Sequence, residues 1–99
     1  STKSFPSMTV KYTETFLQEL TDQVIYIAED KPIAAIKFKD DLEKQIQQLP
    51  KFPLKHPKSI FFDNPIIRDL IFKGYSITYR INNSENVIEI LSLNKHQEK

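Results

Sequence analysis

The stretch that decides the fold is IIRDLIFKGYSITYRINNSENVIEILSL, residues 66–93. It contains three runs of β-branched and aromatic residues, which favour strands, separated by two polar turns. The first turn holds Gly74, the one glycine of the chain, which suits a backbone position with a positive φ. The second turn is rich in asparagine, which bonds its own backbone in turns. The pattern predicts a three-stranded antiparallel meander.

The middle run of the meander alternates between apolar and polar residues. Successive side chains of a strand point to opposite faces of a sheet. We therefore expect one face to be a core wall and the other a polar platform that faces a partner. Tyr75 and Tyr79 could stack on nucleic-acid bases, but their alternation with isoleucine favours the core. The wall would consist of Tyr75, Ile77, Tyr79 and Ile81, and the platform of Ser76, Thr78 and Arg80.

Two helices are predicted ahead of the meander, after a short strand at Thr9–Tyr12. The first begins after Thr13, a good N-cap, and runs to about Glu29. The second begins at Pro32 and runs to about Leu49, where a second proline stops it. The short break makes them an antiparallel hairpin that buries its apolar stripes on the sheet wall. The stripes are Leu17, Leu20, Val24, Ile27 and Ala28, widened by Phe16, and then Ala35, Phe38, Leu42, Ile46 and Leu49.

The fold class that follows is α+β in the order β-α-α-β-β-β, an antiparallel sheet with a helical hairpin packed on one face. A chain of 99 residues can bury one core. We expect one domain over residues 1–99, with a loose leader at 1–7 and a polar tail at 94–99. Residues 51–65 are expected to form a loop that Ile60-Phe61-Phe62 anchors by its apolar side chains.

Composition excludes several classes of protein. The chain has no cysteine, which rules out disulfides and thiolate metal sites. No apolar run approaches the roughly 20 residues of a membrane-spanning helix, so no membrane partner is expected. The 14 basic and 13 acidic residues nearly balance, which argues weakly against a broad nucleic-acid footprint. His56 and His96 lie far apart in the sequence without a carboxylate pattern, so neither a metal site nor another cofactor is expected.

The stretch from Ile67 to Ile81, IRDLIFKGYSITYRI, resembles the core of the RelE/ParE superfamily of bacterial toxins. The resemblance extends from Met8 to Gln97, through the helix that begins PIAA and the ending ILSLNKH. It implies the toxin of a type II toxin–antitoxin system in the bacterial cytoplasm, held silent by a cognate antitoxin that wraps it. RelE-like members cut mRNA on the ribosome, and ParE-like members act on DNA gyrase.

The resemblance also implies where a nuclease would keep its basic residues. RelE-like nucleases have them at the positions of Ile67 and Asp69, and an arginine at the position of Ser76; none of the three is basic here. Lys95 and His96 do fall where the family keeps catalytic groups. The ParE-like reading, in which the toxin binds gyrase without bond chemistry of its own, is therefore favoured. The alternatives are a nuclease that uses Arg80, Lys95 and His96, or a degenerate toxin that binds only antitoxin.

The contact residues can be predicted from residue type. For the target we expect Arg68, Lys73, Arg80, Lys95 and His96, and for the antitoxin the apolar residues Phe16, Ile25 and Ile36. The antitoxin would lay an amphipathic helix or strand on the hairpin and complete a sheet edge. Structural roles compete with these: Arg68 can pair with Asp69 or Glu89, Arg80 can pair across the sheet, and both histidines can be solvated.

Overall fold

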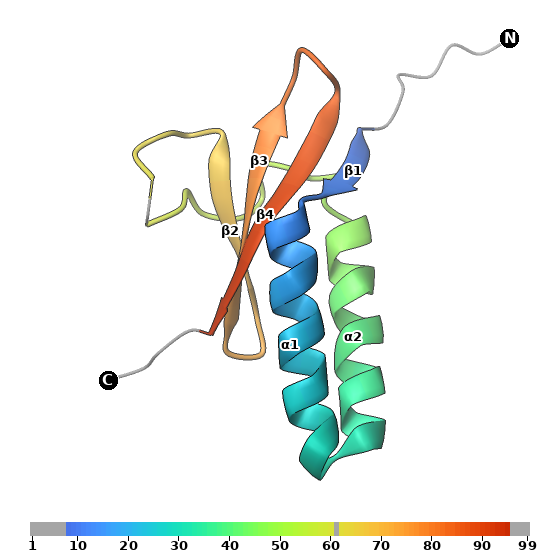
Figure 1. Ribbon diagram of the computed structural model, residues 1–99. Coiled ribbons are helices and arrows are strands. Elements are labelled where there is room, and N and C mark those ends of the chain that lie inside the picture. Colours follow the sequence, from blue (N-terminus) through green and yellow to red (C-terminus); the bar gives the residue numbers. More distant parts are fainter. Residues whose placement is uncertain (1–7, 61, 96–99) are drawn as a thin grey trace, which may run out of the picture.

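Six elements make up the part of the chain that the computed structural model describes, residues 8–60 and 62–95. They are β1 (Thr9–Tyr12), α1 (Glu14–Asp30), α2 (Pro32–Gln47), β2 (Ile67–Phe72), β3 (Tyr75–Asn82) and β4 (Val87–Lys95) (Figure 1). The predicted order β-α-α-β-β-β is confirmed. Neither of these helices is both long and apolar enough to cross a membrane. The predicted leader at 1–7, Phe61 and His96 lie outside the described residues.

The sheet has the strand order β1-β4-β3-β2. The pairs β2–β3 and β3–β4 are antiparallel, which confirms the predicted meander. The strand β1 joins it parallel to β4, from Thr9 opposite Val87 to Tyr12 opposite Ile90, so the sheet as a whole is mixed. A parallel neighbour requires a long crossover connection. Here the hairpin, the long loop and two meander strands all lie between β1 and β4.

Thr13 fixes where α1 starts and which side of it faces the sheet. Its Oγ1 accepts a hydrogen bond from Phe16 N at 3.2 Å, as an N-cap should. The same hydroxyl group lies 2.7 Å from the carbonyl oxygen of Ile90 on β4, to which it donates. This link sets the rotation of α1, with Phe16 fully buried and its ring stacked on Tyr12 at 5.6 Å. Leu17, expected in the buried stripe, is 46% exposed instead.

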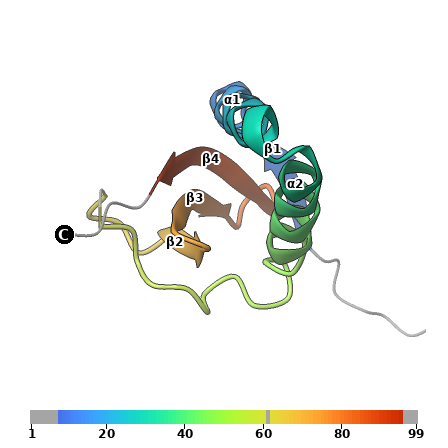
Figure 2. The same ribbon diagram turned by 90° about the horizontal axis from the view of Figure 1, so that it is seen from below.

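The core lies between the hairpin and the wall face of the sheet (Figure 2). The four wall residues of β3 are all buried, as predicted. The ring of Phe38 on α2 packs at 5.0 Å from that of Tyr75 and at 5.9 Å from that of Phe72. Helix α2 ends at Gln47, slightly earlier than expected, and Leu49 is still buried in the following turn. The prediction that the hairpin covers the Tyr/Ile face is confirmed.

Two predictions about the rest of the chain are wrong. The polar platform is not open to water, because Ser76 and Thr78 are 5% and 1% exposed. Of the predicted apolar anchor, the two residues that the structure describes do not anchor the long loop, because Ile60 is 81% and Phe62 is 46% exposed. The two errors share a cause. The loop pairs with the β2 edge of the sheet through its backbone and leaves the side chains of Ile60 and Phe62 outside.

Candidate functional site

The basic residues expected to bind a target lie at opposite ends of the sheet. Lys73 is in the β2–β3 turn, where its Nζ bonds Asp41 of α2 at 3.3 Å. Lys95 ends β4 opposite Tyr75, so it belongs to the same end of the sheet. Arg80 is near the other end of β3, opposite Ile67. Within the described residues, the structure therefore does not gather the predicted set into one basic site.

Arg68 binds the backbone of the chain's own loop. Its Nε donates to the carbonyl oxygen of Pro65 at 2.9 Å, and its Nη1 donates to those of His56 at 2.8 Å and Leu54 at 3.4 Å. The predicted structural pair of Arg68 with Asp69 or Glu89 is not among the ion pairs of the described residues, where Glu89 pairs with Arg80 instead. Arginine suits this role because its planar fork can donate to several acceptors at once. Its contacts are with the backbone and leave no periodic signal in the sequence.

Arg80 forms the cross-strand ion pair that was predicted as its structural role. Its Nη1 lies 2.6 Å from Oε1 of Glu89, directly opposite on β4. The strand β1 places Lys11 on the other side of Glu89. Glu89 thus lies between two basic residues, Arg80 on β3 and Lys11 on β1.

The polar face of the meander has a carboxylate at its centre. Asp69 is 4% exposed, and its Oδ1 accepts a hydrogen bond from Thr78 Oγ1 at 2.8 Å. Its Oδ2 accepts from the backbone N–H of Ile60 at 3.4 Å. Arg80 is the only basic residue that β2, β3 and β4 place on this face within the part of the chain described. The register puts Ile67, Asp69, Ile71, Ser76, Thr78, Arg80, Glu89, Ser92 and Asn94 there.

The connection from α2 to β2, residues 48–66, is fixed by the sheet; we call it the α2–β2 loop. Tyr79 Oη donates to the carbonyl oxygen of Pro53 at 2.6 Å. The backbone N–H of Ser59 donates to Ile67 O at 2.8 Å, and that of Asp69 donates to Pro57 O at 3.0 Å. The loop thereby pairs with the outer edge of β2 and closes it. We call the side chains of Arg68, Asp69 and Tyr79, which hold this loop, the loop clasp.

Burial near the loop clasp shifts the pKa values of two side chains, Tyr79 and His56. Burial raises the pKa of the Tyr79 phenol to about 12, with Asp69 adding to the rise and Arg68 opposing it. His56 lies edge-on to the Tyr79 ring at 6.2 Å between ring centroids. Its burial, helped by Lys55, lowers its pKa. His56 was expected to be solvated; the structure shows it half-buried against the sheet.

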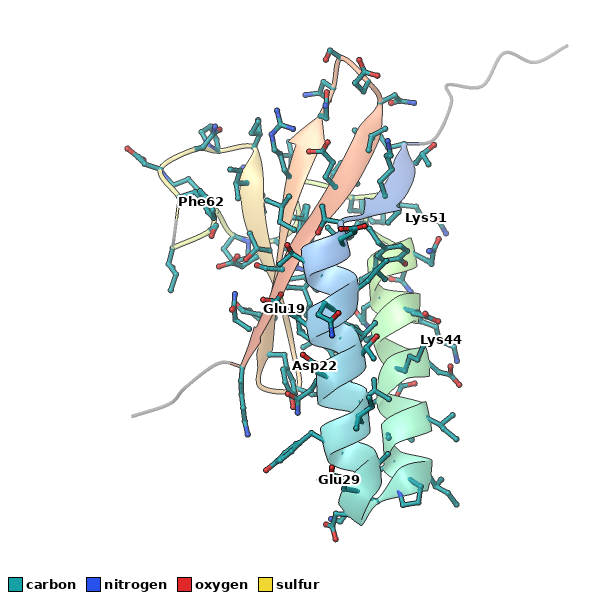
Figure 3. All side chains as sticks on the ribbon, viewed as in Figure 1. Glu19, Asp22, Glu29, Lys44, Lys51 and Phe62 are labelled. Carbon is teal, nitrogen blue, oxygen red and sulfur yellow. The ribbon has the colours of Figure 1, made fainter. Side chains whose placement is uncertain are left out.

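The outer face of the hairpin presents apolar side chains. Ile25 and Ile36, two of the predicted antitoxin contacts, are 54% and 63% exposed, and Ile33 is 81% exposed. The third predicted contact, Phe16, is in the core and cannot meet a partner in this fold. We call Ile25, Ile33 and Ile36 the hairpin surface. Helix α1 beside it carries five acidic residues and no basic one, as Figure 3 illustrates with Glu19, Asp22 and Glu29.

Within residues 8–60 and 62–95, no three His, Cys, Asp or Glu side chains come together in a way that could hold a metal ion.

Comparison with known proteins assigns the family. A family model described as "ParE toxin of type II toxin-antitoxin system, parDE" matches residues 10–99, nearly the whole chain. The chain belongs to the ParE toxin family. A search of curated protein sequences found no match.

Solved structures share the fold at low sequence identity. A chain of the chromosomal ParDE toxin–antitoxin system from P. aeruginosa is 19% identical with a TM-score of 0.76, over 92% of this chain and 98% of that one. The isolated RelE toxin of E. coli is 15% identical with a TM-score of 0.63, over 94% and 88%. A chain of the RelBE2 complex of M. tuberculosis is 19% identical with a TM-score of 0.61, over 92% and 100%. At such identities the likeness establishes the fold alone.

Sequence reasoning missed the loop clasp altogether. One signal was available: Asp69 and Thr78 are polar residues in strongly apolar strands and become cross-strand neighbours once the hairpin register is known. Burial of a carboxylate in such a place requires donors. The loop that supplies one of them has no periodicity of its own.

Proposed function

We propose that this chain is the toxin of a type II toxin–antitoxin pair, that it arrests growth by binding DNA gyrase, and that a cognate antitoxin neutralises it. Membership of the ParE toxin family supports the toxin role. The choice of gyrase over the ribosome follows from the polar face of the meander.

The observation that carries this choice is the buried carboxylate of Asp69 on that face. Cleavage of RNA requires a group that takes the proton of the 2′-hydroxyl and cations that stabilise the phosphorane. An anionic side chain held by Thr78 would repel the phosphate there. Arg80, the basic residue that the three meander strands place on this face in the part of the chain described, is already engaged by Glu89. These contacts support a toxin that acts by binding.

The hairpin surface supports the antitoxin role. Ile33 and Ile36 are three residues apart on α2, so helical geometry puts them on one side of it. An amphipathic segment of the antitoxin would bury them together with Ile25. Since α1 is entirely acidic in its charged residues, we propose that this antitoxin segment carries lysine or arginine beside its apolar positions.

The test is a supercoiling assay with purified gyrase. We expect the wild-type chain to inhibit supercoiling at micromolar concentration, and an equimolar amount of antitoxin to restore it. Full supercoiling at that concentration would refute the gyrase proposal. A parallel translation extract would detect the nuclease alternative: message cut by the wild type and left intact by Arg80→Ala or His96→Ala would replace binding with catalysis.

Expression in cells without antitoxin separates the third possibility. We expect growth to stop on induction. Continued growth, with antitoxin binding retained in vitro, would indicate a degenerate toxin that binds only its antitoxin.

A further inference from the structure

The described part of the α2–β2 loop exposes four large apolar side chains to solvent. Phe52 is 63% exposed, Leu54 62%, Ile60 81% and Phe62 46%. They are spread along one segment, and several exposed apolar side chains on a single segment are a common feature of interaction surfaces. Figure 3 shows how far the segment reaches, from Lys51 near the C-terminal end of α2 to Phe62 beyond β2.

The loop is held in place although its side chains are exposed. The carbonyl oxygen of Pro53 is bound by Tyr79, those of Leu54 and His56 by Arg68, and the N–H of Ile60 by Asp69. All of these contacts use the loop backbone, so the apolar side chains remain available. A preordered segment loses less conformational entropy when it binds. The loop clasp thus presents Phe52, Leu54 and Ile60 in a fixed arrangement.

The charge of the loop indicates the kind of partner. Residues 48–66 hold three lysines and one aspartate, a formal charge of +2 in a chain whose total is +1. The aspartate, Asp63, is 3.3 Å from Lys58. The remaining lysines, Lys51 and Lys55, are exposed. A complementary partner would therefore be acidic where it meets this loop.

The aliphatic side chains of the loop favour a protein over a nucleic acid. Phe52 and Phe62 have rings that could meet either kind of partner. Leu54 and Ile60, which are 62% and 81% exposed, have no ring to stack on a base, and aliphatic side chains gain free energy by filling apolar pockets. The loop contains no arginine, which is the residue that best grips phosphate.

From these features, and resting on the proposed function, we propose that the α2–β2 loop is the target-binding surface of the toxin. It docks into an apolar groove with an acidic rim on gyrase, while the hairpin surface is left to the antitoxin. The target contact is thereby assigned to residues of the loop, and none of the basic residues predicted from the sequence to bind the target lies in it. The assignment also makes Arg68 a positioning residue, which acts on the target through the loop.

The chain offers a closely matched pair of double variants for the test. Leu54→Ala with Ile60→Ala removes side chains that are 62% and 81% exposed on the loop. Ile36→Ala with Ile33→Ala removes side chains that are 63% and 81% exposed on α2. Both pairs should fold like the wild type, since truncating exposed side chains has little effect on stability; circular dichroism and thermal melts check this.

Three measurements are made on each double variant: inhibition of gyrase supercoiling, antitoxin affinity and growth arrest. For the loop pair we expect at least tenfold weaker inhibition and matching loss of growth arrest, with antitoxin affinity within twofold of wild type. For the hairpin pair we expect the opposite, weaker antitoxin binding with inhibition retained. A loop pair that inhibits like the wild type overturns the proposal, and so does one that loses antitoxin affinity while still inhibiting.

Failure of the gyrase proposal is distinguishable from failure of the loop proposal. If wild type does not inhibit gyrase but arrests growth, the target is another molecule, and the loop pair still decides: lost arrest supports the loop as the target surface, and retained arrest overturns it. If wild type neither inhibits gyrase nor arrests growth, both proposals fall. Loop-dependent binding to a labelled DNA or RNA oligonucleotide would overturn the assignment of a protein partner.

Discussion

The hairpin surface and the α2–β2 loop expose similar isoleucine and leucine side chains but are built in different ways. The hairpin surface lies on regular helices whose backbone hydrogen bonds are internal. The loop has no regular structure, and Arg68, Asp69 and Tyr79 of the sheet hold its backbone. The difference teaches that the two surfaces can be disturbed separately. Changes in the loop clasp should alter the loop while leaving the hairpin intact.

Charge separates the two surfaces as well. The two helices that carry the hairpin surface are acidic together, since α1 has five acidic residues and no basic one while α2 has three of each, whereas the loop carries an excess of lysine. Opposite charges discourage a single partner from binding both surfaces, because a segment that suits one is repelled by the other. A toxin that meets an antitoxin and a target would benefit from such a separation.

The largest expected effect comes from a residue on which both surfaces depend. Leu42 of α2 is fully buried in the core between hairpin and sheet. We expect Leu42→Ala to lower the free energy of unfolding by about 2–5 kcal/mol, through lost burial and the cavity left behind. Urea denaturation measures it. Ile33→Ala on the same helix is the control and should change stability by less than about 0.5 kcal/mol. Equal effects of the two variants would contradict the assigned core.

A smaller effect should separate the surfaces. Methionine at position 68 keeps a long side chain but donates no hydrogen bond, so Arg68→Met removes three bonds to loop carbonyl oxygens. We expect a loss of about 1–3 kcal/mol, with faster hydrogen exchange at the Ser59 amide and unchanged exchange in α1.

The matched control is the other arginine of the chain. Arg80 pairs with Glu89 and does not touch the loop in the contacts described. Arg80→Met should cost about 0–1 kcal/mol, as ion pairs at the protein surface do, and leave the hydrogen exchange of Ser59 unchanged. If both variants speed the exchange at Ser59 equally, Arg68 has no special hold on the loop.

The parts of the fold that could be predicted from the sequence are those marked by a periodic pattern along a helix or strand. The period-2 pattern from Tyr75 to Ile81 identified the wall, and the helical spacing through Phe38 and Leu42 identified the face of α2 that covers it. Such patterns work because a regular backbone repeats its orientation. One residue of the predicted α1 stripe was wrong, because Leu17 is 46% exposed while Phe16 and Leu20 are buried. The bond from Thr13 to Ile90 that orients this end of α1 joins positions far apart in the sequence.

The site was harder to predict because its contacts are between side chains and an irregular backbone. Arg68 and Arg80 are arginines on neighbouring strands, yet Arg68 binds loop carbonyl oxygens and Arg80 binds a glutamate. Nothing in their spacing distinguishes them. The exposure of Ile25 and Ile36 was predictable because it follows helical periodicity. The burial of Thr78 was not, because it depends on the path of the loop.

Removing a single hydrogen bond of the loop clasp should have a smaller effect. Tyr79→Phe removes the bond from Oη to Pro53 O and keeps the buried ring. We expect a loss of about 0.5–1.5 kcal/mol at pH 7, measured by urea denaturation. Because the folded pKa of Tyr79 is about 12, above the usual value of 10.0, the unfolded chain releases this proton first as pH rises. Wild-type stability should then fall between pH 10 and 12 relative to Tyr79→Phe. A constant difference between them across that range would contradict the burial of the phenol.

The smallest expected effect is the pH dependence that His56 gives to the loop. Burial lowers its pKa below 6.5 in the folded chain, so the unfolded chain binds the proton more readily. The neutral ring's contribution to stability is complete above the unfolded pKa and is lost as pH falls through the folded one. His56→Phe keeps an aromatic edge against Tyr79 but cannot titrate. We therefore expect the wild type to lose more stability than His56→Phe on going from pH 7.5 to 5, and urea denaturation at both values measures this. An NMR titration that places the His56 pKa at or above 6.5 would show that the loop leaves the ring solvated, and the fixed loop that distinguishes this surface from the hairpin would lose one of its supports.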